Sequence, residues 1–387
     1  MKYLKPIGAA LSTLLLASCA TTEYDTRELG EAPEDKRSSE AGIWMMMAEA
    51  EEDIKTSGAR ITDPALNAYV SDIACRVAGE FCKEMRVYIV DAPVFNAAMA
   101  PNGMMLVNSG LLLRAENEAE MAFVLAHEFG HYVENHSMEK FGTAKNALRW
   151  GQFFDVAALG IPIGTLAAVS SMSSHSREKE TEADIVGLRQ LGDNGYDTSA
   201  ALSIWQNLVD EVEASGNDKK KKNFKRASIF NSHPLTVERI EYLGEEADAW
   251  SGDVTNTKAY QDITRPFLKD WLAGELANRD AGSSLQLINR LKGARTEDLG
   301  QLTYAEAEVY RFRAEEGDTE LALETYIKAS AYDDVPSEAF RQIGDMQTKI
   351  GETDKAVAAF ERYLEVNSDA QDRALIQNII NKMKGDV

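Results

Sequence analysis

The sequence is poor in positive charge. Lys and Arg number 41 against 63 Asp and Glu, which gives a formal net charge of −22. A field of this sign repels nucleic acid and anionic lipid, so we expect no nucleic-acid partner. The hydrophobic fraction of 44% is ordinary for a globular protein, and 387 residues are enough for two or more domains.

Long apolar runs are also missing. The N-terminal run over residues 7–17 is too short to span a bilayer as a mature helix. The most apolar internal stretch, residues 153–170, contains Asp155 and Pro162, and its uncharged portion falls short of the ~20 residues that a spanning helix needs. We therefore interpret residues 153–170 as a buried or lid-forming helical hairpin.

The first residues have the pattern of a targeting segment. Lys2 and Lys5 precede the apolar run, which ends in Leu16-Ala17-Ser18-Cys19. This ending resembles a bacterial lipobox, so we expect a signal peptide over residues 1–18, acylation of Cys19 and a flexible tether over 19–40. The residue after the cysteine is not Asp, which favours a lipid-anchored protein at the periplasmic face of the outer membrane. The alternative is an ordinary secretory signal with an incidental cysteine.

Cysteine is scarce, with three residues in the chain. Once Cys19 is assigned to the anchor, Cys75 and Cys82 remain as a pair in a compartment that permits disulfides. On one continuous helix they would be about 10 Å apart along the axis, which is too far for a bridge. Gly79 offers a helix end between them, so we predict a Cys75–Cys82 disulfide, the alternative being two buried thiols.

The middle of the chain predicts a small sheet followed by a helix. A strand is expected over residues 87–90, and two apolar runs flank Pro101-Asn102-Gly103, a strong hairpin signal. Residues 116–140 have helical periodicity. The predicted fold class is α+β and mainly α.

The predicted helix contains His127-Glu128-Phe129-Gly130-His131. Residues one turn apart project from the same face of a helix, so the two imidazoles lie about 6 Å apart, within reach of one metal ion. Glu128 is placed to take a proton from a water whose pKa the metal lowers. A catalytic zinc site needs a third protein ligand and keeps a fourth position open.

A second motif supplies candidates for that ligand. The HExxH sequence, taken with residues 176–184 (SREKETEAD), resembles the peptidase family of HtpX and the CAAX prenyl endopeptidase. The resemblance implies a gluzincin-type domain over residues 41–250 that binds one Zn²⁺ through His127, His131 and Glu180. It also implies that Asp184 orients a ligand histidine, and that Asn96 and Ala97 belong to an edge strand that holds substrate.

A third segment agrees with this family. Asn231-Ser232-His233-Pro234 with Arg239-Ile240 resembles the family's "THP…RI" segment. Three interpretations of His233 stay open: it hydrogen-bonds the transition state, caps the metal, or is a structural histidine beside a turn proline. His136 and His175 are expected to be surface or structural residues.

The C-terminal third has an internal period of 34 residues. When Thr303 is aligned with Ser337, turn glycine, small packing residue and aromatic recur in order: Gly317 and Gly351, Ala322 and Ala356, Tyr326 and Phe360. A degenerate earlier unit is expected around residues 271–291, with Gly282 at its turn. We predict TPR-like helical repeats over residues 260–387, whose concave surface binds peptide or protein.

Together the lipobox and the repeats narrow the resemblance to the periplasmic, TPR-containing BepA-like branch. It implies a zinc-dependent endopeptidase for periplasmic or outer-membrane proteins, with the repeats recruiting substrate or the assembly machinery. The competing hypothesis is a non-enzymatic periplasmic chaperone or assembly factor with a capped or structural metal site. Glu128 argues against it, because a purely structural site needs no base beside its ligands.

Overall fold

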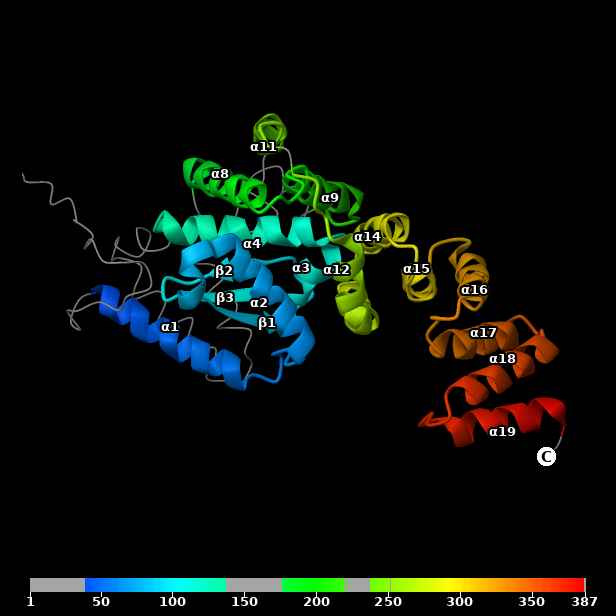
Figure 1. The fold of residues 1–387 in the computed structure, drawn as a ribbon. Helices are drawn as coiled ribbons and strands as arrows, with labels where there is room; N and C mark the ends of the chain where they lie inside the picture. The colour runs from blue at the N-terminus through cyan, green and yellow to red at the C-terminus, as the bar shows by residue number, and fades with distance from the viewer. Residues whose placement is uncertain (1–38, 137–175, 219–220, 222–236, 251, 386–387) are drawn as a thin grey trace, which may run out of the picture.

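The computed structural model describes residues 39–136, 176–218, 221, 237–250 and 252–385 (Figure 1). The expectations for residues 1–18, Cys19, residues 153–170 and His233 lie outside these ranges. The described part is mainly helical with one small sheet, as predicted. Within it, every helix is too short or too polar to cross a membrane.

The sheet has three strands in the order β1-β3-β2. β1 (Arg86–Val90) runs parallel to β3 (Met104–Asn108), and β2 (Ala97–Met99) pairs with β3 in antiparallel register. β2 and β3 form the hairpin expected from the Asn-Gly turn. Gly103 has a φ of +84°, and a Cβ there would lie 2.3 Å from the carbonyl oxygen of Glu84, so glycine is required.

Helices cover both faces of this sheet (Figure 1). α1 (Ser39–Thr56) packs on one face, where Met47 and Ile54 meet side chains of β1 and β3. α2 (Pro64–Ala78) packs against β1 and the central helix on the other side. Gly79, with a φ of +59°, ends α2, and η1 (Gly79–Glu84) folds back so that a disulfide joins Cys75 and Cys82.

The central helix is α4 (Glu118–Val133), which follows the short α3 (Ser109–Arg114). The Asn117 side chain accepts a hydrogen bond from the backbone N–H of Glu120 and caps α4. The predicted helix over residues 116–140 thus begins two residues later, because Asn117 caps it, and a turn at residues 134–135 ends α4; residues 137–140 lie outside the described ranges. α4 lies between the sheet and a layer formed by α8 (Arg177–Asp193) and α9 (Ala200–Ala214), with α11 (Val237–Ala247) beyond (Figure 1).

Two glycines let α4 and α8 approach closely. A Cβ on Gly130 would lie 2.8 Å from the carbonyl oxygen of Ala183, and one on Gly187 would lie 3.1 Å from the Phe123 ring. Because these distances leave no room for a methyl group without movement, the close helix crossing depends on glycine. This crossing brings the HExxH motif next to Glu180.

The helices after residue 250 continue the same core. α12 (Thr257–Thr264), η3 (Arg265–Phe267), α13 (Leu268–Leu276) and α14 (Ala281–Ala294) pack on α2, α3 and α9. The Tyr260 hydroxyl donates to the Leu112 carbonyl at 2.7 Å. The segment between the two predicted domains is tied down, since Val254 pairs with Tyr196 and the Thr255 carbonyl accepts from Glu118 N–H.

The chain ends in helices that extend away from the sheet (Figure 1). They are α15 (Leu299–Arg313), α16 (Asp318–Ala329), α17 (Glu338–Lys349), α18 (Thr353–Val366) and α19 (Arg373–Lys384). Gly317 and Gly351 take φ values of +85° and +84° just before α16 and α18. The aligned alanines and aromatics are buried at equivalent places: Ala322, Ala356, Tyr326 and Phe360. Gly282, in contrast, is not at a turn but within α14, where a Cβ would lie 1.9 Å from the Ala214 carbonyl oxygen.

Candidate metal centre

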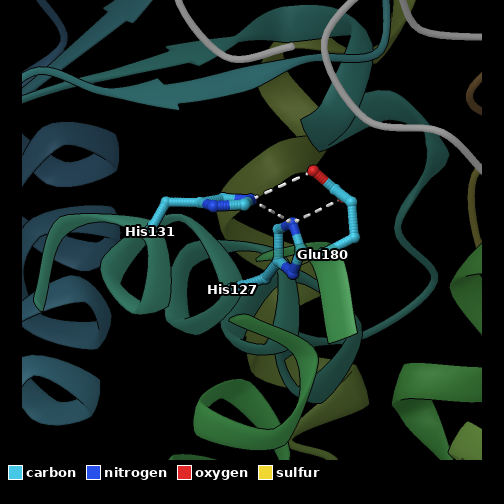
Figure 2. A group of neighbouring side chains, drawn as sticks. All are labelled: His127, His131 and Glu180. Atoms are coloured by element: carbon cyan, nitrogen blue, oxygen red, sulfur yellow. Dashed lines mark hydrogen bonds and ion pairs between the residues drawn. The ribbon is translucent and has the colours of Figure 1, made fainter. Parts of the chain in front are cut away.

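Three side chains converge where α4 crosses α8 (Figure 2). His127 and His131 come from α4 and Glu180 comes from the first turn of α8, and their donor atoms all lie within 4.8 Å of one another. The two Nε2 atoms are 3.1 Å apart, and the Glu180 carboxylate oxygens lie 3.5 Å from His127 Nε2 and 3.3 Å from His131 Nε2. The structure thus brings together the three ligands that the resemblance implied.

The chemistry of this group fits a divalent metal ion. Each of the three residues is at most 1% exposed. Two imidazoles and one carboxylate are a donor set that Zn²⁺ accepts in catalytic sites, with a fourth position left for water. Because a buried carboxylate is costly without a compensating charge, a cation between these donors would stabilise the group.

Asp184 supports the first histidine from one turn further along α8. Its Oδ1 lies 2.9 Å from His127 Nδ1. Arg239 of α11 donates from Nε and Nη2 to Asp184 at 2.5 and 2.7 Å, and its Nη1 lies 2.8 Å from Glu180 Oε2. The Tyr242 hydroxyl also donates to Asp184. Asp184 therefore accepts hydrogen bonds from three sides.

These contacts keep Asp184 ionised. Burial alone would raise its pKa, but the Arg239 guanidinium and the hydrogen bond with His127 more than offset burial and lower the pKa to about 2. Burial would lower the pKa of Arg239, whereas Asp184 and Glu180 raise it above its ordinary range. An anionic Asp184 accepts a hydrogen bond from His127 Nδ1–H, which leaves the Nε2 lone pair directed at the metal position.

Arg239 had no predicted role beyond its place in the "RI" segment. In the structure it is 4% exposed, and its guanidinium lies over the Trp205 ring at 4.9 Å. Trp205 in turn meets the His127 ring edge-on at 6.1 Å between centroids. The available signal was the spacing of Arg239 and Tyr242, three residues apart on one helix and so able to reach the same carboxylate.

His136 was expected to be a surface or a structural residue. The surface alternative is wrong, because His136 is buried. His136 is 2% exposed, and its Nδ1 lies 2.9 Å from His131 Nδ1. On its other side, Nε2 lies 3.0 Å from a carboxylate oxygen of Glu182. His175 lies outside the described residues.

Glu128, the proposed base, and the edge strand β2 both adjoin α4, the helix that carries His127 and His131. Glu128 is 3% exposed and follows His127 on α4, and β2 packs against the same helix. Asn108 N–H donates to the Asn96 carbonyl and Ala100 N–H to the Met104 carbonyl. Since bonding alternates along an antiparallel pair, the backbone groups of Ala97 point away from β3, toward the edge of the sheet.

Residues 60–247 match the model of peptidase family M48, a family of metal-dependent proteases. The match supports family M48 as a whole and not the HtpX or CAAX branch in particular. It includes the three converging side chains and Asp184.

Particular relatives point to two groups of proteases. The beta-barrel assembly-enhancing protease of Escherichia coli K12 is 24% identical over 202 residues, 48% of this chain and 40% of the relative. The mitochondrial metalloendopeptidase OMA1 of Schizosaccharomyces pombe is 29% identical over 184 residues, 46% of this chain and 52% of the relative. Human OMA1 is 29% identical over 171 residues, 41% of this chain and 31% of the relative. The chain thus spans about half or less of the length of these curated relatives.

Proposed function

We propose that this protein is a zinc-dependent endopeptidase that acts on periplasmic or outer-membrane proteins. The observation that carries the proposal is the buried convergence of His127, His131 and Glu180, with Glu128 on the same turn of α4. The M48 family match over residues 60–247 supports the reaction class.

The roles follow from the positions of the side chains. His127, His131 and Glu180 would hold the ion, which when bound polarises a carbonyl and acidifies the attacking water. Glu128 accepts the proton of that water and returns it to the leaving amine. Asp184 and Arg239 hold the ligands in place, because together they contact both His127 and Glu180.

Substrate binding is proposed along β2. The outward backbone groups of Ala97 can pair with an extended peptide, which would add a strand to the sheet. Because β2 packs on α4, a peptide in this position would pass the HExxH motif. Main-chain pairing depends little on side chains, which suits a protease that meets many unfolded segments.

The setting is proposed from the sequence and from the relatives' names. Acylated Cys19 would anchor the chain at the periplasmic face of the outer membrane. Both groups of relatives are named as proteases, and the name of the bacterial group also refers to beta-barrel assembly. The helical pairs α15–α16 and α17–α18 would serve as TPR-like repeats that recruit outer-membrane proteins or their assembly machinery.

The test is a comparison of Glu128→Gln with Glu180→Ala in the full chain. Glu128→Gln should keep bound zinc but lower cleavage of an unfolded outer-membrane protein by about 10²–10⁴-fold, because only the base is lost. Glu180→Ala should lose both zinc and cleavage. Zinc is measured by elemental analysis and cleavage by electrophoresis.

The results also decide the competing hypothesis. A wild-type protein that holds zinc yet cleaves no protein, while it still prevents aggregation of unfolded substrates, would support the chaperone or assembly factor. Full zinc content in Glu180→Ala would show that another carboxylate is the third ligand.

A further inference from the structure

His136 lies just beyond the end of α4, after the turn at residues 134–135. Glu134 N–H still bonds to the Gly130 carbonyl, and Asn135 then takes a φ of +56°. Asn tolerates this left-handed conformation better than most residues. After this turn His136 lies beside His131 and is 2% exposed.

The His136 ring is held between two partners. Its Nδ1 lies 2.9 Å from His131 Nδ1, with the ring planes at 63° and the centroids 5.2 Å apart. Its Nε2 lies 3.0 Å from Glu182 Oε2, whose side chain is 58% exposed. The three side chains form a continuous line from the candidate metal centre toward the surface of α8.

The order of donors along this line is fixed at one end. His131 Nε2 faces Glu180 and His127, so a metal there takes the Nε2 lone pair and the ring proton stays on Nδ1. Nδ1–H then donates to His136 Nδ1. A neutral His136 consequently carries its proton on Nε2 and donates it to Glu182.

We propose that His136 and Glu182 are positioning residues that fix the ring orientation and tautomer of His131. They do for His131 what Asp184 does for His127. Helix α8 then supplies Glu180 to the metal, Asp184 to the outer side of His127 and Glu182 to the far side of His136. This inference rests on the metal site of the proposed function but not on cleavage.

The test compares two substitutions at one position. His136→Phe keeps an aromatic ring but removes the acceptor, and should weaken Zn²⁺ affinity by about 10–100-fold. His136→Asn restores an acceptor oxygen near the Nδ1 position, and should regain most of that affinity. Affinity is measured on the full chain by competition with a chromogenic zinc chelator.

A second measurement reports on the ligand itself. Co²⁺ bound in place of zinc should show a shifted visible spectrum in His136→Phe and a spectrum close to wild type in His136→Asn. Circular dichroism and thermal unfolding in EDTA check that the metal-free variants are folded. If His136→Phe does not fold, the exposed residue Glu182 provides the test instead. Glu182→Ala should lower zinc affinity roughly two- to fivefold, a small loss because water can replace this carboxylate.

The outcomes separate this inference from the proposed function. Wild-type affinity and an unchanged cobalt spectrum in folded His136→Phe would overturn it, as would equal losses in the Phe and Asn variants. For a misfolded Phe variant, unchanged affinity in Glu182→Ala would overturn it. If the wild-type chain binds zinc tightly but cleaves nothing, the proposed endopeptidase function is wrong, while the positioning role of His136 and Glu182 still stands.

Discussion

Helices α4 and α18 are of similar length, 16 and 14 residues, yet they bury different chemistry. In α18 the buried residues form one stripe of alanine, aliphatic and aromatic side chains, and the charged residues face water. In α4 every residue from Glu118 to Tyr132 is buried, including three glutamates and two histidines. The helical pairs at the C-terminus are therefore built as ordinary amphipathic helices, and the centre of the protein is not.

The buried charged residues of α4 contribute less to stability than apolar residues would, but they supply side chains of the candidate metal centre. A buried charge is tolerated only when other elements supply partners, and such pairs add little net stability compared with apolar packing. The charged residues of α4 and α8 do meet partners, from α11 for the candidate metal centre and from α2 and Asn256, the residue before α12, for Glu118. We therefore expect equivalent substitutions in the two regions to differ in size and in their effect on the metal.

The largest difference in the free energy of unfolding is expected between substitutions in two aspartate–arginine pairs. Asp184 pairs with Arg239, which is 4% exposed, whereas Asp318 pairs with Arg313, which is 27% exposed. Asp184→Asn leaves a buried guanidinium without its main counterion, and should lower the free energy of unfolding by about 3–5 kcal/mol. Asp318→Asn should cost much less, because water can solvate Arg313.

Urea unfolding in EDTA, followed by circular dichroism, measures both variants without a contribution from bound metal. Equal losses would remove the contrast between the two regions. A loss at Asp318 larger than that at Asp184 would reverse it.

An intermediate effect is expected at two helix crossings that depend on glycine. In Gly130→Ala the new methyl group meets the backbone of Ala183, so α8 must move and carry Glu180 with it. In Gly344→Ala the methyl group lies 2.5 Å from the Phe360 ring, a side chain that can shift. Each should cost about 1–3 kcal/mol through overpacking, less the gain of up to about 1 kcal/mol in helix propensity.

The metal distinguishes the two glycine variants. Gly130→Ala should weaken zinc affinity by at least about tenfold, since small displacements of a ligand carry a large penalty in a buried site. Gly344→Ala should leave zinc affinity unchanged and serves as the matched control. Chelator competition and thermal unfolding give the two readouts, and unaltered affinity in Gly130→Ala would mean that the crossing does not set the site.

The same contrast explains what could be predicted from the sequence. The hairpin, the 34-residue period and the two histidine ligands depend on local patterns: an Asn-Gly turn, glycines before helices, and histidines one turn apart. Glu180 was expected only from the family resemblance. Arg239 and His136 depend on which helix packs against which, and one sequence does not contain that information. Their local patterns are unremarkable, because a buried arginine and a surface arginine look alike until the opposing carboxylates are in place.

The division into domains at residues 250–260 remains a prediction for a related reason. One hydrophobic core runs from α2 to α15 and includes Tyr260 and Leu287. The Ser-Gly-Asp pattern near residue 251 predicts a turn, but it does not show whether the following helices pack back on the preceding ones.

The smallest effect is expected within α4 itself, in how Glu118 and Glu120 make the free energy of unfolding depend on pH. Burial would raise the pKa of Glu118, but hydrogen bonds from Tyr196, Tyr69 and Asn256 outweigh it and lower the pKa below 4.5. The pKa of Glu120 is raised above 4.5, chiefly by burial. Glu118 thus stabilises the fold above pH 4.5, and this contribution is lost as the pH falls below that value.

Glu120 acts in the opposite sense, because its stabilising contribution is present below pH 4.5 and is lost as the pH rises through its elevated pKa. Glu118→Gln should therefore flatten the loss of stability in acid, and Glu120→Gln should flatten the loss on the neutral side. Both effects are changes of slope in the free energy of unfolding measured between pH 3.5 and 7. Identical slopes in the two variants would show that neighbouring buried carboxylates on α4 are not tuned separately by their partners.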